Sequence, residues 1–128
     1  MIAIGRTWIV VLDDSGARFL RREPSGKWTQ PAAEITSAAA DAFTPGIRRA
    51  ARQQFLQRVM VAADGACDRG ECDRIVTMGP ERLLRSFRKA ATDRVRVRLW
   101  RERAGEVSSL TDEEIVKSVE QYFRLSAG

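Results

Sequence analysis

The sequence predicts an α/β fold, with a single domain over residues 1–128 and a central mixed β-sheet of about five strands covered by helices. Its 128 residues suffice for one domain, whereas two would each be unusually small. Hydrophobic residues make up 44% and charged residues 30%, which is ordinary for globular proteins and excludes disordered and fibrous chains. Strand-like and helix-like patterns follow one another in the order β-β-β-α-β-α-β-α.

The first part of the chain is predicted to form three strands. Residues 8–12 are continuously apolar, and residues 7–12 are therefore expected to form a buried strand. The turn sequence of residues 13–16 leads into a second strand over residues 17–22, with Ala17 and Phe19 on one face and Arg18 and Leu20 on the other. A second turn over residues 24–26 precedes a short third strand over residues 27–29.

A helix is predicted after a loop over residues 31–46, which are rich in Ala and Ser. Apolar residues then recur every four positions, so one face of this helix is expected to meet the core and Gly65 to end it. These recurring positions are Ile47, Ala51, Phe55, Val59 and Ala63. The basic residues off this face are Arg48, Arg49, Arg52 and Arg58.

A strand over residues 73–78 and a second helix are predicted next. The helix begins after Gly79, with Pro80 at an early helical position. Its solvent face carries Arg82, Arg85 and Lys89, which are spaced three and four residues apart. The residues expected to face inward are Leu83, Leu84, Phe87, Ala90 and Ala91.

The last two elements are a strand and a helix. Residues 95–99 alternate between apolar residues and Arg, so the apolar ones are expected to face the core, and Arg96 and Arg98 the opposite side. Thr111 and Glu114 form a predicted capping box that starts the final helix, with Leu110 packing on the helix as a staple. The expected buried residues of this helix are Ile115, Val119, Tyr122 and Phe123.

The net charge of +5 is concentrated in the middle of the chain, where residues 82–103 hold nine basic and two acidic residues. Arg and Lys clusters bind phosphate backbones, so we predict a nucleic-acid-binding surface. Its candidate residues are Arg82, Arg85, Arg88, Lys89, Arg96, Arg98 and Trp100. Trp100 is expected to pack in or beside the core rather than to stack on a base. The alternative is a solvated Arg face, since Arg supplies nineteen of the twenty-two basic residues.

The composition excludes several enzyme classes. Histidine is absent, so no Ser-His-Asp triad, Cys-His pair or His-bearing zinc site can form within this sequence. Cys67 and Cys72 do not have C-x-x-C spacing, and two ordinary thiols are expected, with a local disulfide as the alternative. No catalytic residue, metal ligand or cofactor is assigned. Apolar runs are far shorter than the about 20 residues of a membrane span, so a soluble, cytoplasmic protein that binds no membrane is expected.

Two weaker patterns point to other sites. Asp13 and Asp14 follow the first strand, where nucleases related to ribonuclease H place a metal-binding carboxylate, so a metal-dependent nuclease is a remote alternative. The further carboxylates it would need, Asp73 and Asp93, are expected at the opposite end of the sheet, and adjacent Asp residues usually form turns. The switch at residues 79–80 offers helix amides to an anion, but an ordinary connection is preferred because Glu81 repels phosphate.

The chain resembles the bacterial host-attachment protein family, whose members are described as required for attachment to host cells. The residues that carry the resemblance are 7–13, 16–19, Phe55, 73–76, Pro80, Leu83, Leu84, Arg88, Leu110, Thr111, Glu114 and Ile115. That family is similar to the middle domain of archaeal and eukaryotic class 1 translation release factors. The resemblance therefore implies an α/β fold of that type and an association with RNA or the ribosome.

Two segments depart from the family pattern. The long polar loop before the first helix is shortened to residues 31–46, and the acidic-Lys-Asp-Leu stretch before the last helix is replaced by residues 105–110. The Gly-Gly-Gln signature of release factors is absent, so peptidyl-tRNA hydrolysis is not implied. We therefore expect a non-enzymatic, host-attachment-type module that binds RNA or the ribosome through its Arg-rich face. The alternative is an assembly domain that binds an acidic protein partner or forms a homo-oligomer through the C-terminal region, residues 104–128, whose net charge is −3.

Overall fold

The fold is built on a mixed sheet with the strand order β3-β2-β1-β5-β6. The computed structural model describes residues 5–39 and 43–126. The strands are β1 (Thr7–Leu12), β2 (Gly16–Arg22), β3 (Trp28–Thr29), β4 (Ile35–Thr36), β5 (Arg74–Gly79) and β6 (Leu99–Ala104). β1 runs antiparallel to β2 and parallel to β5, and β6 runs parallel to β5. The predicted α/β fold with a mixed sheet is confirmed.

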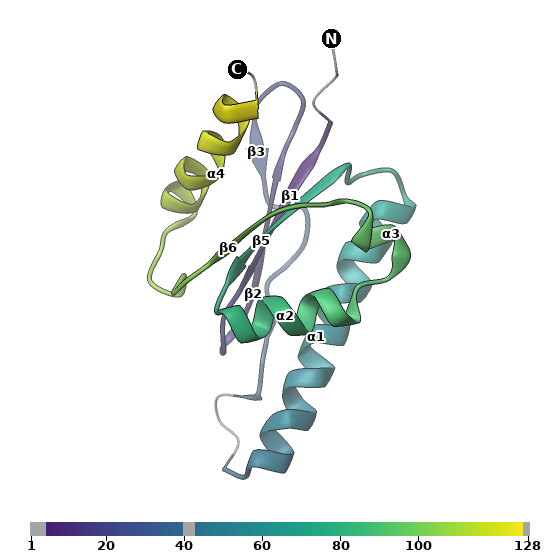
Figure 1. Ribbon diagram of the computed structural model, residues 1–128, viewed down its shortest axis with the longest axis vertical. Helices are drawn as coiled ribbons and strands as arrows, with labels where there is room; N and C mark the ends of the chain where they lie inside the picture. Colours follow the sequence, from purple (N-terminus) through teal and green to yellow (C-terminus); the bar gives the residue numbers. More distant parts are fainter. Residues whose placement is uncertain (1–4, 40–42, 127–128) are drawn as a thin grey trace.

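Helices cover both faces of this sheet, as Figure 1 shows. The helices are α1 (Pro45–Asp68), α2 (Glu81–Ala90), α3 (Asp93–Arg96) and α4 (Asp112–Ser126). Every residue of β1 is buried, because successive side chains point to opposite faces that are both covered. Trp8 and Val10 pack with residues of α1, α2 and α3, whereas Ile9 and Val11 pack with residues of α4.

The loop predicted over residues 31–46 contains the short strand β4, which pairs with β2. Residues 40–42 of that segment lie outside the described residues. α1 then begins at Pro45, with the Thr44 side chain as its cap. The N-terminal half of α1 extends beyond the sheet in Figure 1, so Ile47, predicted to meet the core, is exposed.

The prediction that Gly65 ends the first helix is wrong. α1 continues to Asp68 because Ala66 and Cys67 still bury apolar surface against the core. Gly70 follows the cap residue Arg69, and its positive φ of 73° allows its N–H to bond the Cys67 carbonyl while the next N–H bonds the Ala66 carbonyl. These two bonds are those of a Schellman motif, for which glycine is the favoured residue.

The strand predicted over residues 95–99 is also wrong, because most of this segment forms α3 and the turn after it. Thr92 caps this helical turn by accepting a hydrogen bond from the Val95 N–H, at 3.3 Å. Val95 is buried as expected, but Val97 is 77% exposed. β6 begins only at Leu99, so Arg96 and Arg98 do not project together from a strand face.

The remaining helix predictions largely hold. Leu83, Leu84, Phe87 and Ala91 are buried, whereas Ala90, expected to face inward, is exposed at the last turn of α2. In α4 the capping box is confirmed: the Thr111 N–H donates to the Glu114 carboxylate at 3.0 Å, and the Glu114 N–H donates to the Thr111 hydroxyl at 3.2 Å. The predicted stripe of α4 packs against the sheet, with Tyr122 and Leu110 half-buried.

The carboxyl ends of β1 and β5 approach each other closely at Gly79. This residue has a φ of 150°, and a Cβ atom on it would lie 2.3 Å from the Leu12 carbonyl oxygen. Gly79 also accepts a hydrogen bond from the Gly105 N–H, at 2.9 Å. The start of α2 is thereby fixed beside the turn that joins β1 to β2.

Two further predictions concern the cysteines and the membrane. Cys67 and Cys72 are buried free thiols, so the expected pair of ordinary thiols is confirmed. Burial raises the pKa of both thiols above their ordinary value. Across residues 5–39 and 43–126, no helix combines the length and apolar character needed to cross a membrane.

Candidate nucleic-acid interface

Basic side chains from two helices form a continuous surface on the side of the sheet that α1 and α2 cover. We call this set the α1–α2 basic surface, and it consists of Arg48, Arg49, Arg52, Arg82, Arg85 and Lys89. Two neighbouring hollows connect the helices. The first is lined by Arg48 and Arg52 of α1 and by Arg82 of α2, and the second by Arg49 and Arg52 of α1 and by Lys89 of α2.

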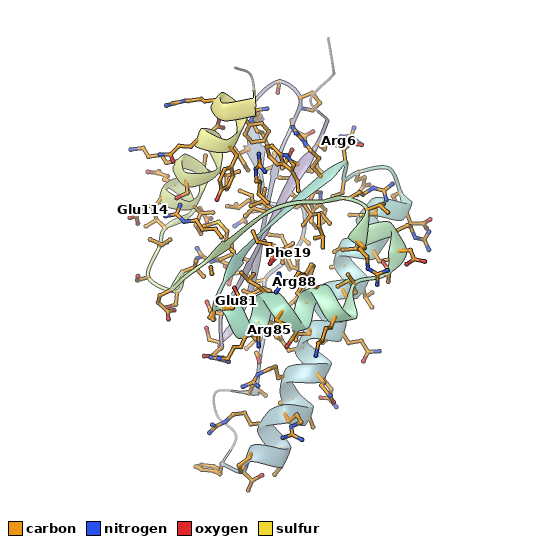
Figure 2. The ribbon with its side chains drawn as sticks, viewed as in Figure 1. Arg6, Phe19, Glu81, Arg85, Arg88 and Glu114 are labelled. Carbon is orange, nitrogen blue, oxygen red and sulfur yellow. The ribbon has the colours of Figure 1, made fainter. Side chains whose placement is uncertain are left out.

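Arg85 completes this surface. It lies three residues after Arg82 and four before Lys89, so the three side chains share one face of α2. Figure 2 shows Arg85 on the side of α2 from which the N-terminal half of α1 extends, with Arg88 and Glu81 on the opposite side. Neither Arg85 nor Lys89 forms a hydrogen bond or ion pair with another residue that the structure describes, so both charges face solvent.

The first hollow has a volume of about 500 Å³, and among the described residues the carboxylate that lines it is that of Asp14 in the β1–β2 turn. Asp14 forms an ion pair with Arg82, and both side chains are about half-exposed. The hydrogen bond from Arg82, together with the charges of Arg82, Arg52 and Arg48, lowers the pKa of the Asp14 carboxyl. The hydrogen bond to Asp14 likewise raises the pKa of Arg82. Basic groups thus outnumber carboxylates around this hollow in the part of the chain that the structure describes.

Three of the predicted site residues are held away from this surface by contacts within the chain. Arg88 pairs with Glu81 and Glu102, at 3.3 and 2.9 Å, on the side of α2 that faces β6. Arg96 pairs with Asp93 and donates to the Ala91 carbonyl.

Arg98 has a structural role as well. Its guanidinium donates to the carbonyl oxygens of Cys72 and Arg94, at 3.2 and 2.7 Å, and thereby ties the α3–β6 turn to the start of β5. The predicted cluster therefore divides in two. Arg82, Arg85 and Lys89 lie together, whereas Arg88, Arg96 and Arg98 stabilise the fold locally.

Trp100 lies on the other face of the sheet, where it packs beside α4. Its ring lies 5.3 Å from the ring of Phe123, and the Arg74 guanidinium stacks on it at 4.0 Å. The expectation that Trp100 packs in or beside the core is confirmed. Because the ring faces are occupied by these neighbours, Trp100 does not belong to the α1–α2 basic surface.

The acidic residues of the nuclease alternative do not converge. The Asp13 carboxylate accepts hydrogen bonds from the Ser15 and Gly16 N–H groups, at 2.7 and 2.9 Å, and so shapes the turn after β1. Asp73 precedes β5, which runs parallel to β1, and therefore lies at the opposite end of the sheet, where it accepts from the Arg6 N–H. Within the described part of the chain, no group of three or more metal-ligating side chains is present.

The sequence prediction missed Arg48, Arg49 and Arg52, which it assigned only to the solvent face of a helix. A signal was present, because Arg52 lies four residues after Arg48 and three after Arg49, which places it beside both on the surface of α1. Helices that cover the same face of one sheet often pack side by side, and this would have joined the α1 group to the α2 group.

The comparisons with known proteins support the fold alone. No protein-family model matches the chain, and no curated protein matches it. A solved structure of an archaeal translation termination factor shares the fold at 13% identity, with a TM-score of 0.60, over 94% of this chain and 40% of that one. A second structure, described as an archaeal protein, gives 12% identity and a TM-score of 0.54 over 94% of this chain and 39% of that one. The chain therefore spans about two-fifths of these proteins, and the expected release-factor-like fold is confirmed.

Proposed function

We propose that this protein is a non-enzymatic binding module that contacts RNA, on the ribosome in the cytoplasm, through the α1–α2 basic surface. The observation that carries this proposal is the convergence of six basic side chains from two helices on one surface, where Asp14 is the one carboxylate that the described residues bring to the hollows. Such a surface releases counterions when it neutralises phosphates, which favours binding to nucleic acid.

Two charges of this surface, those of Arg85 and Lys89, are unpaired among the residues that the structure describes, and this distinguishes them from the other basic residues. Most remaining Arg side chains in the middle of the chain are paired, as in the contacts of Arg88 with Glu102 and of Arg94 with Asp68. Arg85 and Lys89, by contrast, lack a partner in the described part of the chain and stay available to phosphates. Arg also presents a planar set of donors that suits phosphate oxygens.

The ribosomal part of the proposal draws on two likenesses. The termination factor that shares the fold is, by its name, a factor of translation. The resemblance to the host-attachment family suggests a link to attachment to host cells. In that case the module would influence attachment indirectly, by regulating translation. Both likenesses suggest the ribosome as the first place to look for the RNA.

The test is a comparison of two charge-reversal variants by fluorescence anisotropy with single-stranded RNA, duplex RNA and duplex DNA of equal length. The Arg85→Glu, Lys89→Glu variant changes the α1–α2 basic surface. The Lys117→Glu, Arg124→Glu variant makes the same change in net charge, from +5 to +1, on α4 across the sheet. All four side chains are exposed, so both variants are expected to fold.

We expect the α2 variant to lose RNA binding and the α4 variant to retain most of it. For single-stranded RNA, the slope of log affinity against log salt should fall by about 0.7 for each phosphate contact removed. Equal weakening by both variants would mean that only net charge matters and would contradict the proposal, as would wild-type protein that binds no RNA.

A second candidate function is assembly through copies of this chain. Phe43 and Ile47, at the N-terminal tip of α1, are 99% and 62% exposed, and Arg48 and Arg49 follow them. A groove of about 520 Å³ beside α4 offers apolar and acidic side chains to this tip, from Leu20, Trp28, Val116, Asp112 and Glu113, and its lining also includes Thr29, Gln30 and Lys117.

In this second function the tip of one copy would occupy the groove of the next. Such head-to-tail contacts form rings or open chains rather than simple pairs. Sedimentation velocity over a range of protein concentrations tests the idea, since Phe43→Ser should abolish any self-association. A wild-type protein that stays monomeric at high concentration would remove this candidate.

A further inference from the structure

The hollow between the β1–β2 turn, α1 and α2 has the features of a ligand site within the basic surface. It encloses about 500 Å³, which lies inside the range of about 300–1,000 Å³ usual for small-molecule sites. Among the described residues, its charged lining consists of Asp14, Arg48, Arg52 and Arg82, with Ala39 as a further wall. Three elements distant in sequence therefore contribute to one concave, positively charged site.

Arg52 brings an unmet hydrogen-bonding requirement to this site. Its Nε–H is buried and has no acceptor among residues 5–39 and 43–124. A buried donor without a partner is costly, and native proteins rarely leave one unmet. Arg52 also lines the hollow, so an oxygen-rich anion there would accept hydrogen bonds from the other N–H groups of this guanidinium and hold it in place.

Arg82 is contacted by a carboxylate of the chain itself. Its ion pair with Asp14 joins the first turn of α2 to the β1–β2 turn, and both side chains are about half-exposed, so the contact can open without disturbing the core. A guanidinium has five N–H donors, and one carboxylate leaves several of them free. Asp14 thus holds Arg82 over the hollow and also competes with any other anion for it.

We propose that this hollow binds a phosphate group, with Arg52 and Arg82 as the donors and Asp14 as the competing internal carboxylate. The inference rests on the same surface as the proposed function but assigns a defined pocket within it. The size of the hollow leaves room for a sugar attached to the phosphate. The phosphate could come from the 5′ end of an RNA strand or from a free mononucleotide.

Binding to the pocket is measured with inorganic phosphate and AMP as probes, by isothermal titration calorimetry. Arg52→Met removes the guanidinium and keeps an apolar stem, and we expect it to weaken binding by about 10- to 100-fold, as for a lost charged hydrogen bond. Asp14→Asn removes the competing charge, and we expect up to about fivefold tighter binding. Lys117→Met on α4 serves as the control and should leave the affinity unchanged.

Asp14→Asn is included beside Arg52→Met because a loss of binding in Arg52→Met alone could result from misfolding. Asp14 is an exposed turn residue whose neighbour Asp13 makes the hydrogen bonds that shape the turn, so Asp14→Asn should keep the fold. A gain of affinity cannot result from unfolding. Weaker binding by Asp14→Asn, or equal binding by Arg52→Met and wild type, would overturn the proposal.

The source of the phosphate is found by comparing one RNA with a 5′-phosphate and with a 5′-hydroxyl. Preference for the phosphorylated strand that disappears in Arg52→Met identifies an RNA end, and tight AMP binding without such a preference identifies a mononucleotide. RNA binding with no response to phosphate, AMP or the 5′ group would overturn the pocket and leave the proposed function standing. AMP binding without any RNA binding would overturn the proposed function and leave the pocket standing.

Discussion

Replacing Gly79 by Ala is expected to destabilise the protein strongly, and the structure allows the cost to be divided into two parts. The first part is conformational, because the φ of 150° is one that side chains other than glycine rarely adopt. This costs about 1–3 kcal/mol. The second part is steric, because the new Cβ would lie 2.3 Å from the Leu12 carbonyl oxygen.

The steric part adds about 1–3 kcal/mol, as for overpacking of a rigid site, so Gly79→Ala should cost about 2–6 kcal/mol in total. Gly105 isolates the conformational part. It has nearly the same φ, 149°, but a Cβ there would meet no atom within 4 Å, so Gly105→Ala should cost about 1–3 kcal/mol. Gly46, at the start of α1, also has open space, and Gly46→Ala should stabilise the protein by up to about 1 kcal/mol.

The assay is urea unfolding followed by tryptophan fluorescence, with the free energy of unfolding taken from the midpoint and slope of each curve. The order of stability should be Gly46→Ala, wild type, Gly105→Ala and Gly79→Ala. If Gly79→Ala costs no more than Gly105→Ala, the close approach of β1 and β5 does not restrict this position and the reasoning fails. Since Gly79 sets the distance between the β1–β2 turn and α2, Gly79→Ala should also weaken phosphate binding at the pocket.

Three further predictions use the same unfolding assay or a thiol reagent. Cys67 and Cys72 should react with a disulfide reagent only after unfolding, because burial shields them and raises the pKa of each thiol; rapid reaction of the folded protein would contradict this. Thr111→Ala should cost about 0.5–2 kcal/mol, because it removes the cap of α4, and an unchanged stability would show that the cap contributes nothing. The Arg82 hydrogen bond lowers the pKa of Asp14 below 3.8, so this ion pair stabilises the fold above that pH and its contribution is lost as the pH falls through the folded-state pKa. The pair is about half-exposed, so Asp14→Asn should cost only about 0.2–1 kcal/mol at pH 7, and this cost should shrink as the pH falls through the folded-state pKa.

The elements that the sequence predicts correctly are those whose signals are local. The capping box of Thr111 and Glu114 joins residues three apart, so its geometry follows from the helix itself. The alternation of residues 95–99 misleads because a five-residue pattern also fits one helical turn, and the Thr92 cap decides for the helix. Gly65 misleads because the burial of Ala66 and Cys67 outweighs the propensity of a single glycine.

The candidate site shows the same division between local and long-range signals. Arg82, Arg85 and Lys89 share a helical face, and their spacing alone predicts that they lie together. The contribution of Arg52 depends on how α1 packs beside α2 on the sheet, and the contribution of Asp14 depends on where the β1–β2 turn lies. Neither follows from spacing, because both depend on contacts between elements far apart in the sequence.

Charge counting along the chain overestimates the basic surface, because it treats every Arg as a free charge. Arg98 donates to two main-chain carbonyls, and Arg88 is neutralised by two carboxylates, so both act as structural connections. A guanidinium with five donors is suited to this use in a chain that has no His and few Lys. Binding to an external phosphate is then left to side chains that the fold does not use, and Arg85 and Lys89 meet that condition. Reversal of Arg88 should therefore affect stability first, whereas reversal of Arg85 should affect binding alone.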